Sequence, residues 1–135
     1  MRVCVAAWLA AGVLMLGCSK KKNDDCQKLV QAVGPQHAAV AAAYGRSDQT
    51  PAELEEQAVA WEKASVELAA LPLESEDVKS LAGQFSSVLA KAARIRRGMA
   101  GAGLDPMAAG KVQAEAVSFM VEESKAKAAL DIACR

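Results

Sequence analysis

The sequence predicts an all-α protein, an up-down-up-down bundle of four helices. Alanine makes up 26 of the 118 residues that follow the first 17, which favours helices packed closely through small side chains. Apolar residues recur at steps of three and four along four stretches of the chain. The connections between these stretches are short, so neighbouring helices should run antiparallel.

The first helical stretch should begin near Asp24 and end near Tyr44. Gly34-Pro35 interrupts it. Because proline lacks an amide donor and clashes with the preceding turn, we expect a kink or a break into two short helices. If the break destroys this helix, the alternative is a three-helix bundle with a loose N-terminal segment. The inward stripe of the stretch consists of Cys26, Val30, Val33, His37, Val40 and Tyr44.

The other three helices each have a recognisable start. Thr50, Pro51 and Glu53 combine a capping box with a proline at the first helical position. Ser75 can cap the third helix, and Asp105-Pro106 opens the fourth. The inward stripes are Leu54, Ala58, Trp61, Ser65 and Leu68 in the second helix, Val78, Leu81, Phe85, Val88, Ala92, Ile95 and Met99 in the third, and Val112, Ala116, Phe119, Ala126 and Leu130 in the fourth.

The helix ends are marked by proline and glycine. Pro72 should stop the second helix near Leu71. Glycine is less favourable in a helix than alanine by about 1 kcal/mol, so the cluster Gly98, Gly101 and Gly103 should end the third. The fourth helix should run to about residue 133.

Charge is distributed unevenly between the second and third helices. Residues 53–77 hold eight acids and one base, whereas residues 79–111 hold six bases and one acid. The two helices should attract each other, although an exposed ion pair contributes only about 0.2–1 kcal/mol. Arg94, Arg96 and Arg97 could form a basic patch for an anionic partner, but a solvated face is the favoured interpretation. The chain as a whole is neutral, which gives no argument for a nucleic-acid partner.

Catalytic and metal-binding patterns are missing from the sequence. His37 is the single histidine and lies on an apolar stripe, so we interpret it as a core residue with one hydrogen-bond partner. Glu115, Glu122 and Glu123 are expected to face solvent. No Glu-x-x-His pair, Cys-x-x-Cys-His haem motif, Gly-x-Ser-x-Gly elbow or phosphate-binding glycine loop occurs. The residues therefore favour a non-enzymatic protein without a metal or cofactor.

The first 18 residues have the pattern of an export signal. One positive charge, Arg2, precedes an apolar run of about fourteen residues and a small residue, Gly17. The run is shorter than the roughly 20 residues that a transmembrane helix needs. Residues 14–18, Leu-Met-Leu-Gly-Cys, resemble the lipobox of bacterial lipoproteins. The resemblance implies cleavage after Gly17, a diacylglycerol on the Cys18 thiol, and a new amino group that can be acylated, for example with palmitate.

Several consequences follow from this resemblance. Two or three acyl chains would give lasting membrane attachment. Ser19 stands where aspartate favours the inner membrane in Gram-negative lipoproteins, so the outer membrane is favoured. Lys20, Lys21 and Lys22 would lie beside the lipid, where they could attract anionic headgroups or simply form a solvated tether. The alternative is an ordinary signal peptide, with Cys18 free or in a disulfide.

The cysteines predict one crosslink. Cys4 lies in the removed segment and Cys18 carries the lipid, which leaves Cys26 and Cys134 in a compartment that permits disulfides. An up-down-up-down topology places both at the same end of the bundle. Two buried free thiols are the alternative, and a metal site is less favoured because two cysteines and one histidine do not make a structural zinc set.

These predictions define a signal peptide over residues 1–17, a flexible lipidated tether over 18–25 and a helical domain over 26–135. The helical domain resembles the small cysteine-bearing lipoproteins of myxobacteria, through Cys26, Leu71-Pro72-Leu73 and Asp131-Ile132-Ala133-Cys134. That resemblance implies no activity. We expect an envelope lipoprotein, anchored by membrane lipid, that binds an envelope partner or has a structural role. The alternatives are a carrier of a small apolar ligand in the bundle core and an inhibitor of an envelope hydrolase.

Overall fold

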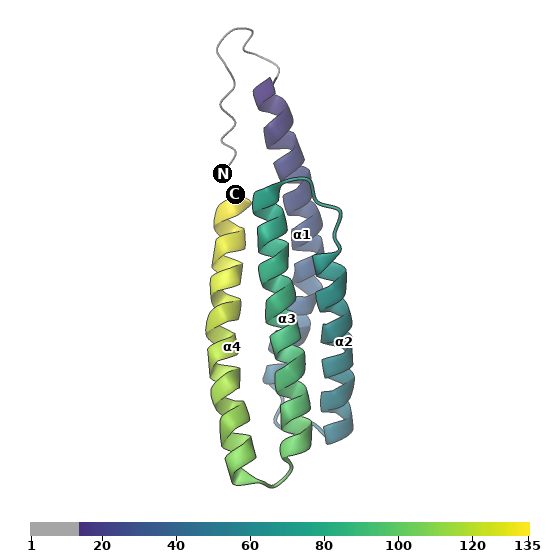
Figure 1. The fold of residues 1–135 in the computed structure, drawn as a ribbon, viewed down its shortest axis with the longest axis vertical. Helices are drawn as coiled ribbons and strands as arrows, with labels where there is room; N and C mark the ends of the chain where they lie inside the picture. The colour runs from purple at the N-terminus through teal and green to yellow at the C-terminus, as the bar shows by residue number, and fades with distance from the viewer. Residues whose placement is uncertain (1–13) are drawn as a thin grey trace.

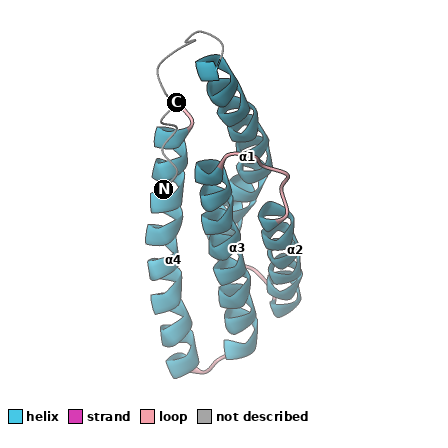
Figure 2. Cartoon of the chain, turned by 45° about the horizontal axis from the view of Figure 1, so that its top comes forward, coloured by secondary structure: helices cyan, strands magenta, loops and turns pink. Residues whose placement is uncertain are grey.

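A computed structural model describes the backbone of residues 14–135 and the side chains from residue 20 onward. It contains four helices: α1 (Leu14–Tyr44), α2 (Pro51–Ala69), α3 (Glu76–Ala102) and α4 (Pro106–Ala133). Figure 1 shows that successive helices run in opposite directions, and Figure 2 shows the short loops that join them. The described part of the chain has no strand. The predicted all-α four-helix bundle is therefore confirmed.

The four helices do not form a symmetric square. Helix α3 lies between α2 and α4 and packs along both, while α1 lies behind them and packs across α2 and α3 (Figure 1). Over their described lengths, no Cα atom of α1 comes within 8 Å of a Cα atom of α4. The bundle is thus a layer of three helices with α1 laid on one face of it.

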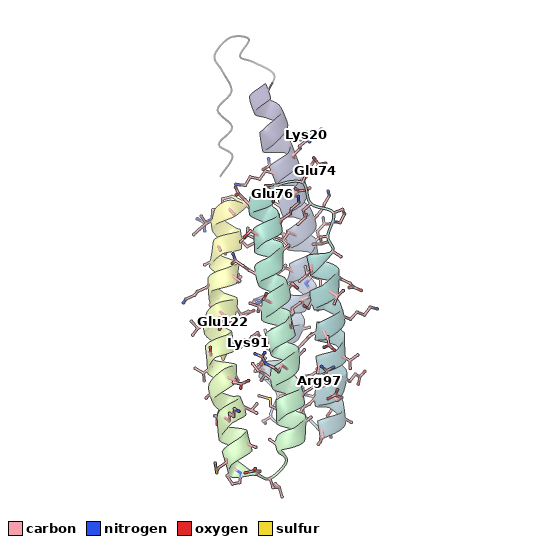
Figure 3. All side chains as sticks on the ribbon, in the orientation of Figure 1. Lys20, Glu74, Glu76, Lys91, Arg97 and Glu122 are labelled. Atoms are coloured by element: carbon pink, nitrogen blue, oxygen red, sulfur yellow. A yellow bond between two sulfur atoms is a disulfide. The ribbon has the colours of Figure 1, made fainter. Side chains whose placement is uncertain are left out.

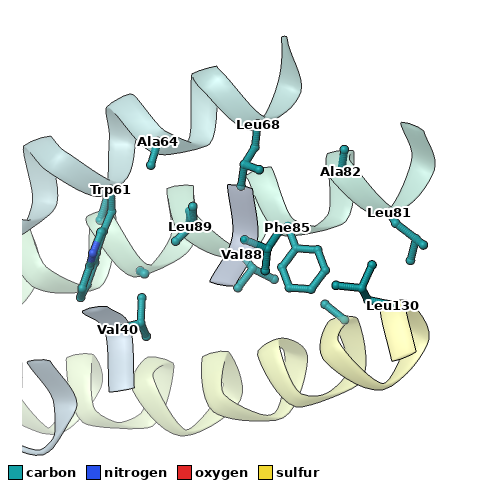
Figure 4. Close-up of a cluster of buried hydrophobic side chains, with 14 of the residues drawn as sticks. Val40, Trp61, Ala64, Leu68, Leu81, Ala82, Phe85, Val88, Leu89 and Leu130 are labelled. Carbon is teal, nitrogen blue, oxygen red and sulfur yellow. The ribbon is translucent and has the colours of Figure 1, made fainter. Parts of the chain in front are cut away.

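Most positions of the predicted inward stripes form the core, part of which the close-up in Figure 4 shows, whereas Leu54 of α2 lies outside it. In α3 the predicted stripe positions between Val78 and Ile95 are buried, as expected. Helices α2 and α3 pack closely because Ser65 and Ser86 face each other, each hydroxyl donating to the other residue's carbonyl oxygen at 2.8 Å. This exchange satisfies two hydroxyl groups at the centre of the contact without separating the helices.

The stripe of α1 differs from the prediction at one position. Val30 is 48% exposed, and Leu29 is fully buried in its place. The buried apolar positions are Cys26, Leu29, Val33, Val40 and Ala43. A step of three from Cys26 to Leu29 and of four to Val33 rotates the stripe by one residue, and both steps are compatible with a single helix face.

The break predicted within α1 and the flexible tether predicted before it are both absent. The helix continues through Pro35 without breaking into two, and residues 20–25, expected as a flexible tether, are helical. Because Leu29 and Val33 before the proline and Val40 after it are buried in one core, both halves are held in line by packing. Proline in a helix interior costs about 3 kcal/mol, and the burial of several apolar side chains on both sides of it can outweigh this cost.

The predicted helix starts are confirmed for α2 and α4. The amide of Glu53 donates to the Thr50 hydroxyl at 3.3 Å, and the Glu53 carboxylate accepts from the Thr50 amide at 2.7 Å. Asp105 accepts from the Met107 amide at 3.0 Å. Ser75 precedes α3, but its side chain makes no capping hydrogen bond, so this part of the prediction is wrong.

Helix α3 ends before Gly103, the last of the three glycines that were predicted to end it. Gly98 and Gly101 are helical, and only Gly103 has a positive φ, of 53°. At Gly98 an added Cβ atom would lie 3.0 Å from a methyl group of Val112. Gly98 therefore allows close packing of α4 on α3 and does not stop the helix.

Candidate functional site

The two cysteines of the helical domain form the predicted disulfide. Cys26 and Cys134 are bonded, with their Cα atoms 5.6 Å apart. The bond joins α1 to the residue that follows α4, across a sequence separation of 108. It closes the chain at one end of the bundle, where the α2–α3 connection also lies (Figure 1).

Asp25, the residue before the disulfide, holds the α2–α3 connection. Its side chain is buried, at 1% exposure, and its Oδ2 atom accepts from the amides of Glu74 and Ser75, both at 2.7 Å. A carboxylate at this position supplies acceptors that Ser75 itself does not provide, at the positive end of the α3 dipole. The bond from the Ser75 amide is the largest cause of a lowered pKa for Asp25, and burial opposes it.

Lysines surround this end of α1. Lys28 donates to Asp25 at 3.4 Å and to the carbonyl of Pro72 at 3.2 Å, and Lys21 pairs with Glu74 at 2.6 Å. Figure 3 shows Lys20, Glu74 and Glu76 gathered at this end of the molecule. One lysine of the run that was expected beside the lipid, Lys21, therefore pairs with the acid of the α2–α3 connection. We call the group Asp25, Cys26, Lys28, Glu74, Ser75 and Cys134 the closed end.

Replacing Asp25 with asparagine should destabilise the protein most at neutral pH. Because the native pKa lies below its ordinary value of 3.8, the unfolded state binds the proton first as pH falls. The stabilisation is thus complete above about pH 4 and disappears as the pH falls through the native pKa. Thermal melts of the wild type and Asp25→Asn across this range should show two melting temperatures that converge in acid.

The neighbouring acid provides the control. Asp24 is exposed, so Asp24→Asn should melt like the wild type at every pH. A gap between wild type and Asp25→Asn that stayed constant down to strong acid would show that the carboxylate charge contributes nothing.

The predicted lipid site, Cys18, falls outside the residues whose side chains are described. Its acylation, and cleavage after Gly17, stay predictions. Within the described residues, none of the helices has the length and apolar character to cross a membrane.

His37 has the hydrogen-bond partner that was expected, and the partner is Glu123. Nδ1 of His37 on α1 lies in direct contact with Oε1 of Glu123 on α4. The Glu123 side chain is only 19% exposed, so the expectation that it faces solvent is wrong. This polar pair spans the gap between two helices whose backbones stay apart.

The three arginines of α3 do not form one patch. Arg94 is exposed, whereas Arg97 pairs with Glu55 at 3.0 Å and with Glu62 at 2.7 Å on α2. This is the predicted attraction between the acidic and basic helices, and it raises the pKa of Arg97 above its ordinary value, chiefly through the bond with Glu62. Arg96 is buried, at 3% exposure, which neither of the sequence-based interpretations anticipated.

The core has little free space. A cavity of about 20 Å³ lies among α1, α2, α3 and α4, lined by Val40, Phe85, Phe119 and the His37–Glu123 pair, among others. A cavity of this size holds about one water molecule. No group of three or more potential metal ligands is found among the described side chains.

Comparison of the chain with protein-family models, with curated proteins and with solved structures found no match.

Proposed function

We propose that this chain is a lipoprotein of the bacterial envelope, held by acyl groups on Cys18 and acting without catalysis as a partner-binding or structural module. One observation carries the proposal. Cys18, in a sequence that resembles a lipobox, stands eight residues before Cys26, and Cys26 forms the disulfide that closes the helical domain. A pull on the lipid is therefore applied at the crosslinked end of the bundle.

The arrangement of the closed end supports this proposal. The disulfide ties α1 to the end of α4, and Asp25 ties α1 to the start of α3. Load that enters through α1 is shared by three helices, so an anchored domain would keep its fold under tension. In this orientation the α2–α3 connection faces the membrane, and the α1–α2 and α3–α4 connections face away from it.

The carrier hypothesis is less well supported. The core cavity of about 20 Å³ is far smaller than the roughly 300–1,000 Å³ of typical ligand pockets. The inhibitor hypothesis needs a free loop. Of the two candidate loops, residues 46–49 and 101–104, the first is held in place because Arg46 pairs with Asp48 at 3.2 Å and with Glu53 at 3.3 Å.

The proposal is tested by replacing the anchor residue, Cys18, alone. Cys18→Ser should remove acylation and release the protein from the membrane fraction of a Gram-negative host. Cys4→Ser is the matched control, because this cysteine lies in the segment that cleavage removes, and it should fractionate like the wild type. Retention in the membrane of a Cys18→Ser chain that has lost residues 1–17 would overturn the lipid anchor. Crosslinking in intact cells would then identify the envelope partner, and an absence of any partner would leave the structural role.

A further inference from the structure

A second polar cluster lies at the end of the bundle away from the disulfide. Its centre is Arg96 on α3, and its other members are Tyr44 at the end of α1, Gln49 in the α1–α2 connection, and Gln57 and Trp61 on α2. Arg96 is 3% exposed, and within the described chain no carboxylate lies in ion-pair distance of its guanidinium. A buried cation without a counter-charge is unfavourable unless a ligand or a partner group compensates for it.

The guanidinium is positioned by aromatic rings and by one of its nitrogens. Its Cζ atom lies 4.1 Å from the centre of the Tyr44 ring and 5.4 Å from that of Trp61. Nη1 donates to Oε1 of Gln49 at 2.9 Å and contacts the Met99 sulfur at 3.6 Å. Burial lowers the pKa of Arg96, yet a guanidinium remains protonated at any physiological pH.

The other two nitrogens are free. Nε and Nη2 of Arg96 are buried, and neither has a hydrogen-bond partner in the described chain. These two atoms form one edge of the planar guanidinium, and such an edge binds the two oxygens of a carboxylate side by side. The fork is therefore fixed in place by Gln49 and the aromatic rings, and its second edge is buried without a hydrogen-bond partner in the described chain.

Three further buried atoms without a partner belong to the same cluster. They are the Tyr44 hydroxyl, Nε2 of Gln49 and Oε1 of Gln57. Four of the five free atoms can donate a hydrogen bond, and only the Gln57 oxygen is purely an acceptor. Buried polar atoms are normally paired, so five exceptions in one place indicate a ligand with several acceptor oxygens.

We infer that the Arg96 cluster binds a small organic carboxylate, with both carboxylate oxygens on Nε and Nη2 of Arg96. A surface groove of about 460 Å³ between α1 and α2 adjoins the cluster, and Gln49, Gln57 and Trp61 line it. Arg46, Glu53 and Glu56 line the same groove, and their net negative charge disfavours a dianion such as phosphate more strongly than a monoanion. Trp61 and the alanines of the groove lining suit the apolar part of an organic monoanion. This inference is independent of the lipid anchor.

The test uses the purified protein and acetate as the probe, with sodium chloride at equal ionic strength as the reference. Acetate should raise the melting temperature saturably and should shift the Arg96 Nε–Hε resonance in a ¹H–¹⁵N spectrum. The Arg94→Lys variant, changed at an exposed arginine of the same helix, should respond like the wild type. Arg96→Lys keeps the charge but loses the fork, so its acetate affinity should fall about tenfold or more.

Three results would contradict the proposal. A chloride response equal to the acetate response would reduce the effect to ionic strength and overturn the site. A stronger response to inorganic phosphate would overturn the assignment to a carboxylate. If Arg96→Lys does not fold, the wild-type spectrum alone decides, because an Nε–Hε resonance that stays fixed at saturating acetate contradicts binding at this edge.

Discussion

Replacing Cys26 with serine should lower the free energy of unfolding by up to about 4.7 kcal/mol under oxidising conditions. The disulfide closes a loop with a sequence separation of 108, and chain entropy gives roughly this value for a loop of 100 residues. A typical domain has about 5–15 kcal/mol of stability in total, so the loss is large. Loss of the bond should weaken the association of α1 with α4 in particular, because the Cα atoms of these two helices nowhere approach within 8 Å along their described lengths.

Urea unfolding followed by circular dichroism would measure this change. Cys134→Ser should be as unstable as Cys26→Ser, and the double variant should be no worse than either, since all three lack the same bond. A reducing agent should bring the wild type to the level of the variants and should leave the variants unchanged. Equal stability of wild type and variants in oxidising buffer would contradict a role for the crosslink.

Replacing Phe119 with alanine should cost about 3–5 kcal/mol, the range for a buried aromatic side chain. Phe119 is 1% exposed on α4, and its ring stacks on Tyr44 of α1 with centroids 5.5 Å apart. Tyr44 in turn stacks on Trp61 of α2 at 6.4 Å. Removal of the Phe119 ring would enlarge the existing core cavity and would remove an aromatic contact between α1 and α4.

The next residue along α4 is the control. Met120 is 56% exposed, so Met120→Ala should unfold at nearly the same urea concentration as the wild type. The reduced and oxidised forms of Phe119→Ala should both be measured, because α1 and α4 would then be joined mainly by the disulfide. Similar losses in Phe119→Ala and Met120→Ala would mean that α4 does not pack as described.

The fold could be predicted because its determinants are local. Thr50 with Glu53, and Asp105 with Pro106, mark helix starts within four residues of sequence, and the three-and-four spacing marks the buried face. The disulfide followed from cysteine number and topology. The helix-start and spacing signals do not depend on where one helix lies relative to another, and the disulfide needed only the up-down-up-down order of the helices.

The polar contacts could not be predicted in this way. Asp25 caps the segment before α3 from about 50 residues away, and the His37–Glu123 pair joins positions 86 apart. Arg96 looks in the sequence like its exposed neighbours, and only the rotation of α3 against Tyr44 and Trp61 buries it. Pro35 looks like a break, yet packing on both sides keeps α1 continuous. Each outcome depends on tertiary placement, which spacing along the chain does not encode.

The anchor is tested most directly by the intact mass of the protein extracted from membranes with detergent. The proposal predicts a chain that begins at Cys18 and carries a diacylglycerol and acyl groups on that residue, with Cys26 and Cys134 oxidised. Fragmentation should place all of the added lipid mass on the N-terminal residue. A mature chain with an unmodified Cys18, or one that begins at another residue, would contradict the proposal.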